Sequence, residues 1–159
     1  EIENQAFAQG LELINDPSLL NEVVGLIEWP VVLMGKLEDQ FLSLPLEVLQ
    51  TSMREHQKFF SLLNPKNKKV VQFATVANRE TSDNGSTILA GNQKVLSARL
   101  ADAKFFWDND LRIINTSGLD LWLEKLKQVT FHNKLGNQFE RVERIVNLSA
   151  TIAKIIGIP

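Results

Sequence analysis

Residues 90–107 form the longest run of the sequence without a turn signal, and this run constrains the fold more than any other segment. Alanine, leucine, glutamine, lysine and arginine dominate it, and these residue types have high helix propensities. Leu96, Leu100, Ala103 and Trp107 recur at spacings of three and four residues, which places them on one face of a helix. The segment therefore predicts a helix that packs an apolar stripe against the core.

The same segment ends in an aromatic cluster, Phe105, Phe106 and Trp107. We expect this cluster to be buried, because burying one phenylalanine side chain contributes roughly 1.5–3 kcal/mol. Basic residues are interspersed among the apolar ones. The helix should therefore have a buried apolar face and a partly basic outer face.

The composition limits the class of protein. The chain has 159 residues, 44% of them hydrophobic and 23% charged, which is typical of one globular domain or two small ones. The net charge of −2 argues against a surface that binds nucleic acid all over, although a local basic patch stays possible. The sequence has no cysteine, which excludes disulfides, thiolate zinc sites and a cysteine nucleophile. No apolar run approaches the roughly 20 residues of a membrane span, no signal peptide is recognised, and both termini look like cuts from a longer chain.

Apolar periodicity and breaker residues predict the order of elements along the chain. We expect helices over 6–14 and 19–28, a strand over 29–35, a helix over 46–55, a hairpin of 58–64 with 70–78, the helix over 90–107, a connector over 108–118, and helices over 119–131 and 138–156. Strands close in sequence pair antiparallel, so the fold class is α+β. It should contain a small antiparallel sheet, of about three strands or more, flanked by helices and followed by a helical C-terminal part. The predicted parts are a helical lead-in over 1–28, an α+β domain over 29–110 and a helical segment over 111–159.

No residue pattern predicts a catalytic centre or a metal site. The two histidines, His56 and His132, lie far apart in sequence and have no neighbouring metal ligand. The acidic doublets at 38–39 and 108–110 fall in predicted polar loops, where solvated caps are the simpler interpretation. No glycine-rich phosphate loop and no nucleophile elbow is present.

Basic residues give the one pattern with a functional interpretation. Lys66, Lys68 and Lys69 crowd the predicted hairpin tip, where such residues usually only discourage edge pairing. A patch that contacts RNA phosphates could form if the hairpin packs beside the long helix. Its candidate residues are Lys58, Arg79, Lys94, Arg99 and Lys104.

Several stretches match the pattern of a known family in the same order and with similar gaps. They are residues 24–33, 44–49, 53–60, 73–78, 91–106, 126–136 and 141–145. On these stretches the sequence resembles the beta subunit of the bacterial heterotetrameric glycyl-tRNA synthetase, and it corresponds to an internal part of that longer subunit. It departs from the family at Ser97, where a basic residue is common, and over 137–140, where a lysine is usual nearby.

The resemblance implies a function for the whole enzyme. In that family the alpha subunit activates glycine with ATP and Mg²⁺, and the beta subunit supplies tRNA recognition and holds a cytoplasmic alpha2-beta2 heterotetramer together. We therefore expect this chain to be a noncatalytic part of a glycine–tRNA ligase, without a cofactor of its own, that contributes to binding glycine tRNA and the alpha subunit. Two alternatives stay open, namely a purely structural subunit-interface module and an editing-type domain that acts on mischarged tRNA.

Overall fold

A computed structural model describes residues 1–158 and divides the chain into two compact units. The first unit comprises residues 1–107 and the second begins at Asp108. The predicted division into 1–28, 29–110 and 111–159 differs from this and stays a prediction. Each unit is described by itself.

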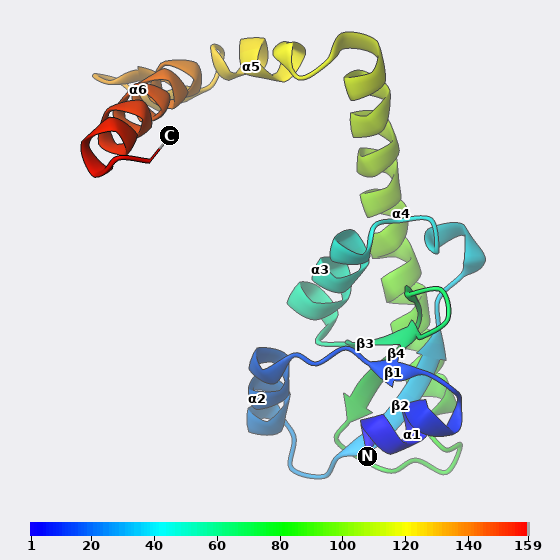
Figure 1. Ribbon diagram of the computed structural model, residues 1–159. Helices are drawn as coiled ribbons and strands as arrows, with labels where there is room; N and C mark the ends of the chain where they lie inside the picture. The colour runs from blue at the N-terminus through cyan, green and yellow to red at the C-terminus, as the bar shows by residue number, and fades with distance from the viewer. Residues whose placement is uncertain (159) are drawn as a thin grey trace. The chain divides into compact units, whose positions relative to one another are not determined.

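The first unit is built on a four-stranded antiparallel sheet with the strand order β1-β3-β4-β2 (Figure 1). The predicted α+β class and antiparallel sheet are confirmed. The strands are β1 (Glu12–Leu13), β2 (Val31–Lys36), β3 (Phe60–Asn64) and β4 (Lys69–Ala77). The two residues of β1 lie opposite Leu63 and Leu62 of β3.

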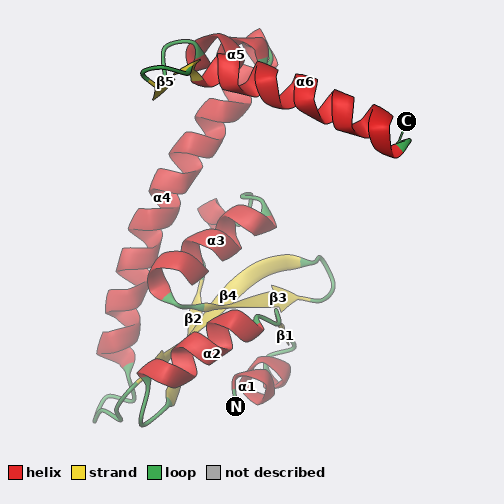
Figure 2. Ribbon diagram, turned by 90° about the vertical axis from the view of Figure 1, so that its left-hand side faces the viewer, coloured by secondary structure: helices red, strands yellow, loops and turns green. Residues whose placement is uncertain are grey.

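The helices that accompany this sheet overlap the predicted ones, but the first and the last of them begin four residues earlier than predicted and also end elsewhere (Figure 2). The helix predicted over 6–14 is wrong beyond Ala8, because Gly10 takes a positive φ of 69° and turns the chain into β1. The connector predicted over 108–118 is also wrong, because the long helix continues to Ser117 and ends before Gly118, whose φ is 67°. The helices are α1 (Ile2–Ala8), α2 (Pro17–Leu26), η1 (Asp39–Phe41), α3 (Leu46–Gln57) and α4 (Ser86–Ser117).

The core of the first unit is formed by two hydrophobic clusters, and neighbouring residues of β4 belong to different ones. Phe73 joins the cluster that includes Met53 of α3 and Leu100 of α4. Ala74 joins the cluster that includes Ala6 of α1 and Leu19 of α2. Because successive side chains of a strand point to opposite faces, β4 contributes to the core on both faces of the sheet.

Phe73 is among the largest fully buried side chains of the first cluster. Its side chain is fully buried, and its ring stacks on that of Phe59 with centroids 4.7 Å apart. Gly35 lies directly opposite Phe73 on β2. A Cβ atom at position 35 would overlap the Phe73 ring, so the glycine leaves the space that the ring occupies.

For the long helix α4, the predicted burial of the apolar stripe is confirmed, whereas the predicted burial of the whole aromatic cluster is wrong. Leu96 and Leu100 are buried as predicted, and Trp107 is partly buried against the same cluster. Phe105 and Phe106 are instead 69% and 63% exposed, so their predicted burial is wrong. Successive helical residues are about 100° apart, so one member of the aromatic cluster can face the core while its neighbours point away.

The loop before α4 is ordered by hydrogen bonds to Asp83. Its carboxylate accepts hydrogen bonds from the Thr81 hydroxyl at 2.5 Å, the Gly85 amide at 3.2 Å, the Ser86 hydroxyl at 3.0 Å and the Thr87 amide at 2.9 Å. These bonds satisfy amides at the start of α4 that have no partner within the helix. The hydrogen bonds from Thr81, Thr87 and Ser86 hold the pKa of Asp83 well below its ordinary value.

Replacing Asp83 with alanine is expected to lower the melting temperature at neutral pH. Because the folded-state pKa is lowered, the stability that Asp83 contributes is present above the ordinary carboxyl pKa of 3.8 and is lost as the pH falls below it. The difference in melting temperature between the native chain and Asp83→Ala should therefore shrink on acidification. Calorimetric melting curves at neutral and acidic pH measure it, and a difference that grows in acid would contradict the role of the ionised carboxylate.

The second unit contains α5 (Asp120–Leu126), β5 (Thr130–His132), β6 (Gly136–Asn137) and α6 (Gln138–Ile156). The helix predicted over 119–131 is wrong at its end, where β5 pairs with β6. The predicted bounds of α6 are confirmed, and Asn137 and Glu140 form a reciprocal capping box at its start. None of the described residues 108–158 is buried. Among residues 1–158, no helix is both long and apolar enough to cross a membrane.

Candidate nucleic-acid interface

The five basic residues predicted to contact RNA lie in different surroundings. Lys58 follows α3 in the left-handed conformation, and its ammonium group is 2.8 Å from a Glu22 carboxylate oxygen of α2. Arg79 is exposed in the loop after β4. Lys94 and Arg99 are exposed on α4, whereas Lys104 is partly buried on the same helix. The roles of these residues in RNA contact stay a prediction.

Helical geometry separates the three cations of α4. Lys94 and Arg99 are five residues apart, which corresponds to about 140° around the helix axis. Lys104 is ten residues from Lys94, so the two differ by about 80° and about 15 Å along the axis. The three side chains therefore leave α4 in three directions and do not form one compact cluster.

The exposed aromatic residues align with the exposed cations. Phe105 lies eleven residues after Lys94, which brings the two within about 20° of each other around α4. Phe106 lies seven residues after Arg99, with the same small angular difference. One line along the helix surface thus joins Lys94 and Phe105, and a second line joins Arg99 and Phe106. We define the outer face of α4 as the exposed residues on these two lines and on the helix surface between them. It comprises Lys94, Val95, Ala98, Arg99, Asp102, Phe105 and Phe106.

This combination of groups suits single-stranded or looped nucleic acid. Cations contact phosphates, and exposed aromatic rings stack on bases whatever the sequence. Phe105 and Phe106 already contact each other edge to face, with centroids 5.6 Å apart. The sequence contained the signal for this face, because positions 105 and 106 fall off the stripe that includes Leu96 and Leu100.

Position 97 has a structural contact that the sequence did not indicate. The Ser97 hydroxyl donates a hydrogen bond to the Glu38 carboxylate, which links α4 to the segment before η1. This bond, together with a second one from Gln40, lowers the pKa of Glu38. A basic residue at position 97 could therefore pair with Glu38, so a change of charge there does not by itself indicate contact with RNA.

The two histidines belong to elements other than α4, whereas the acidic doublet at 108–110, which was predicted to lie in a polar loop, is part of that helix. Among residues 1–158, no group of three or more histidine, cysteine, aspartate or glutamate side chains could hold a metal ion. His56 is exposed in the last turn of α3. His132 lies in β5, where its Nδ1 accepts a hydrogen bond from the Lys134 amide at 3.2 Å.

Comparison with known proteins assigns the chain to a class and then to a family. Its relatives are ligases that join an amino acid to tRNA, as their names state. The family model described as glycyl-tRNA synthetase beta subunit matches residues 1–158. The chain belongs to the glycyl-tRNA synthetase beta subunit family, as the resemblance predicted.

Three relatives show how similar the chain is and how much of them it covers. It is 66% identical over 155 residues to the glycine–tRNA ligase beta subunit of Ruegeria sp. strain TM1040, covering 97% of this chain and 23% of the relative. Identity to the same subunit of Paracoccus denitrificans is 58%, covering 99% of this chain and 23% of the relative. Identity to that of Rhodospirillum centenum is 50%, covering 96% and 21%. The chain thus spans less than a quarter of the length of these relatives.

Proposed function

We propose that the chain is a noncatalytic part of a cytoplasmic glycine–tRNA ligase that helps to bind glycine tRNA and to assemble the enzyme. Membership of the beta subunit family supports this proposal. The alpha subunit would bind ATP with Mg²⁺ and form glycyl-tRNA, in an alpha2-beta2 heterotetramer. This chain would hold no cofactor and supply no catalytic residue.

The outer face of α4 is the observation that carries the RNA part of the proposal. Its two exposed phenylalanines lie on the same lines along the helix as two exposed cations, Lys94 and Arg99. A solvated lysine or arginine needs no special explanation, but two phenylalanines exposed by more than 60% remain unexplained by the fold of the first unit. Stacking of unpaired bases on these rings would bury them while the cations contact the flanking phosphates.

The second unit supports the assembly part of the proposal. Among residues 108–158 no side chain is buried, and α6 exposes six large aliphatic residues. Exposed apolar residues that form a large patch are rare on monomeric proteins and mark interaction sites. The exposed residues are Ile145, Val146, Leu148, Ile152, Ile155 and Ile156.

Binding of glycine tRNA should separate the roles of charge and stacking on α4. Lys94→Ala is expected to weaken binding and to reduce the slope of log K against log salt by about 1, because one phosphate contact is lost. Phe105→Ala should weaken binding by about 1–3 kcal/mol without changing that slope, because stacking releases no counterions. Fluorescence anisotropy of labelled tRNA between about 50 and 200 mM salt measures both quantities.

Two variants serve as controls for this experiment. Lys66→Ala removes an exposed positive charge from the turn between β3 and β4, and should leave the affinity close to that of the native chain. Asp102→Asn removes the negative charge of the outer face and should strengthen binding. If the folded chain binds no tRNA even at low salt, the RNA part of the proposal is wrong and only the role in assembly remains.

A further inference from the structure

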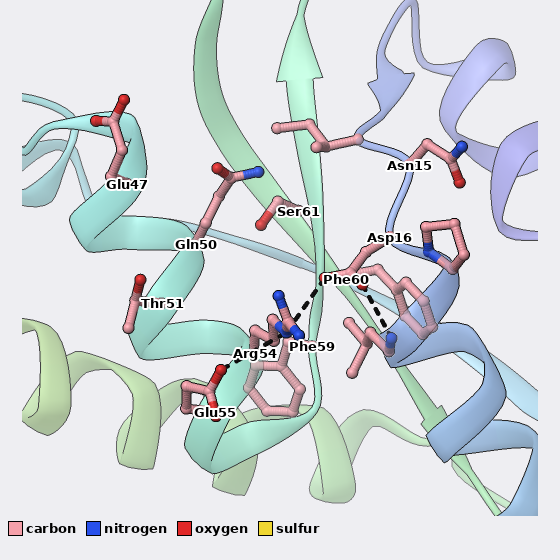
Figure 3. A pocket seen from close by; sticks show the side chains of 13 residues that line it. Asn15, Asp16, Glu47, Gln50, Thr51, Arg54, Glu55, Phe59, Phe60 and Ser61 are labelled. Atoms are coloured by element: carbon pink, nitrogen blue, oxygen red, sulfur yellow. Dashed lines mark hydrogen bonds and ion pairs between the residues drawn. The ribbon is translucent and has the colours of Figure 1, made fainter. Parts of the chain in front are cut away.

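A cavity of about 430 Å³ lies in the first unit between α2, α3 and β3, away from the outer face of α4 (Figure 3). Its apolar lining comes from Ile14 and Leu19 and from Phe59 and Phe60 beside them. The other lining residues are polar or charged, apart from Pro17. An apolar lining combined with a few convergent polar groups is typical of ligand sites, whose volumes range from about 300 to 1,000 Å³.

Ser61 is the most buried of the polar residues that line this cavity. The residue is only 7% exposed, and within residues 1–158 its hydroxyl makes no hydrogen bond. No fully buried side-chain nitrogen or oxygen in that part of the chain lacks a partner, so the Ser61 oxygen is accessible from the cavity. Figure 3 shows the Ser61 hydroxyl and the Gln50 amide directed into the space between β3 and α3. A hydroxyl that has no protein partner and is accessible from the cavity can donate a hydrogen bond to a ligand or accept one from it.

The charges that line the cavity do not balance. Three carboxylates, those of Asp16, Glu47 and Glu55, accompany one guanidinium, that of Arg54. Arg54 Nε lies 3.4 Å from an Asp16 oxygen and 3.6 Å from a Glu55 oxygen. One positive charge is thus shared between carboxylates, and the cavity has a net negative charge that would repel a phosphate.

We propose that this cavity binds a basic side chain, arginine or lysine, from a protein partner. The methylene stem of that side chain would lie on the apolar lining. Its cationic head would pair with the excess carboxylates and donate hydrogen bonds to the Ser61 hydroxyl and the Gln50 carbonyl. This proposal does not depend on RNA binding. Together with the proposed RNA contact, it places nucleic acid at α4 and a protein partner at the α2–α3 cavity.

A pair of small probes tests the proposal on the chain itself. Nα-acetyl-L-arginine methylamide carries the guanidinium, and Nα-acetyl-L-citrulline methylamide has nearly the same shape without the charge. The arginine probe should shift the amide NMR signals of Gln50, Thr51 and Ser61 and saturate in the millimolar range, as expected for one anchoring side chain. The citrulline probe should bind at least about tenfold more weakly.

Variants at the rim of the cavity show whether the negative charge of the carboxylates causes the arginine probe to bind. Glu47 and Glu55 are exposed on α3, so Glu47→Gln with Glu55→Gln should keep the fold and weaken the arginine probe by about tenfold or more. Equal binding of the two probes, or unchanged binding in the double variant, would overturn the proposal. Adenosine monophosphate is the third probe, and if it shifts the same signals more strongly, the cavity is a nucleotide site and the proposal is wrong.

Discussion

Replacing Phe73 with alanine is expected to lower the free energy of unfolding by about 3–5 kcal/mol. The side chain is fully buried, it stacks on Phe59, and it fills the space opposite Gly35. Its removal leaves a cavity in the cluster that joins the sheet to α3 and α4, and surrounding side chains refill such cavities only in part. The midpoint of urea unfolding, followed by circular dichroism, measures the loss.

Phe105→Ala is the matched control for this prediction. It makes the same chemical change at a ring that is 69% exposed, so stability should change by no more than about 0.5 kcal/mol. Comparable destabilisation by the two variants would contradict the stabilising role of the buried Phe73 ring. The control also ensures that a loss of tRNA affinity in Phe105→Ala does not come from unfolding.

Gly35→Ala is expected to destabilise the chain by about 1–3 kcal/mol, although it adds only one methyl group. The new Cβ would overlap the ring of Phe73, which cannot move away without disturbing its stacking on Phe59. The same unfolding measurement detects the effect. A stable Gly35→Ala chain would mean that the core is packed more loosely than the described contacts indicate.

Gly25→Ala is the control for this second prediction. Gly25 lies in α2, and a Cβ atom there would meet no other atom within 4 Å. Alanine should therefore stabilise the helix by up to about 1 kcal/mol, because it loses less backbone entropy than glycine. The two Gly→Ala variants should thus change stability in opposite directions.

The sequence predicted the elements whose signals are local. The bounds of α6 follow from a capping residue and an apolar period, and the burial of Leu96 and Leu100 follows from their spacing. Strand β1 has only two residues, and its partners in β3 lie about fifty residues further along the chain. Residues 6–14 therefore resembled one helix, because nothing within them indicates that pairing.

The candidate sites also differ in whether local sequence signals predict them. Helix geometry alone separates Lys94 from Arg99 and places Phe105 away from the core, so the outer face of α4 could have been predicted. The pairing of Lys58 with Glu22 could not, because it depends on how α2 and α3 approach each other. The α2–α3 cavity is likewise formed by segments that are distant in sequence, and no local pattern in any of them indicates it.

The strand order leaves β2 at an edge of the sheet, where chains with a weakened core can aggregate. Within residues 1–158, β2 pairs only with β4, so the hydrogen-bonding groups on its other side face no strand. Its residues Val31–Met34 are apolar, and an unpaired edge of this kind can add a strand from another molecule. Pro30 before the strand and Lys36 at its end are residue types that limit such pairing. Chains destabilised at Phe73 or Gly35 should therefore precipitate through β2 as concentration rises, and their refolding yield should fall with it.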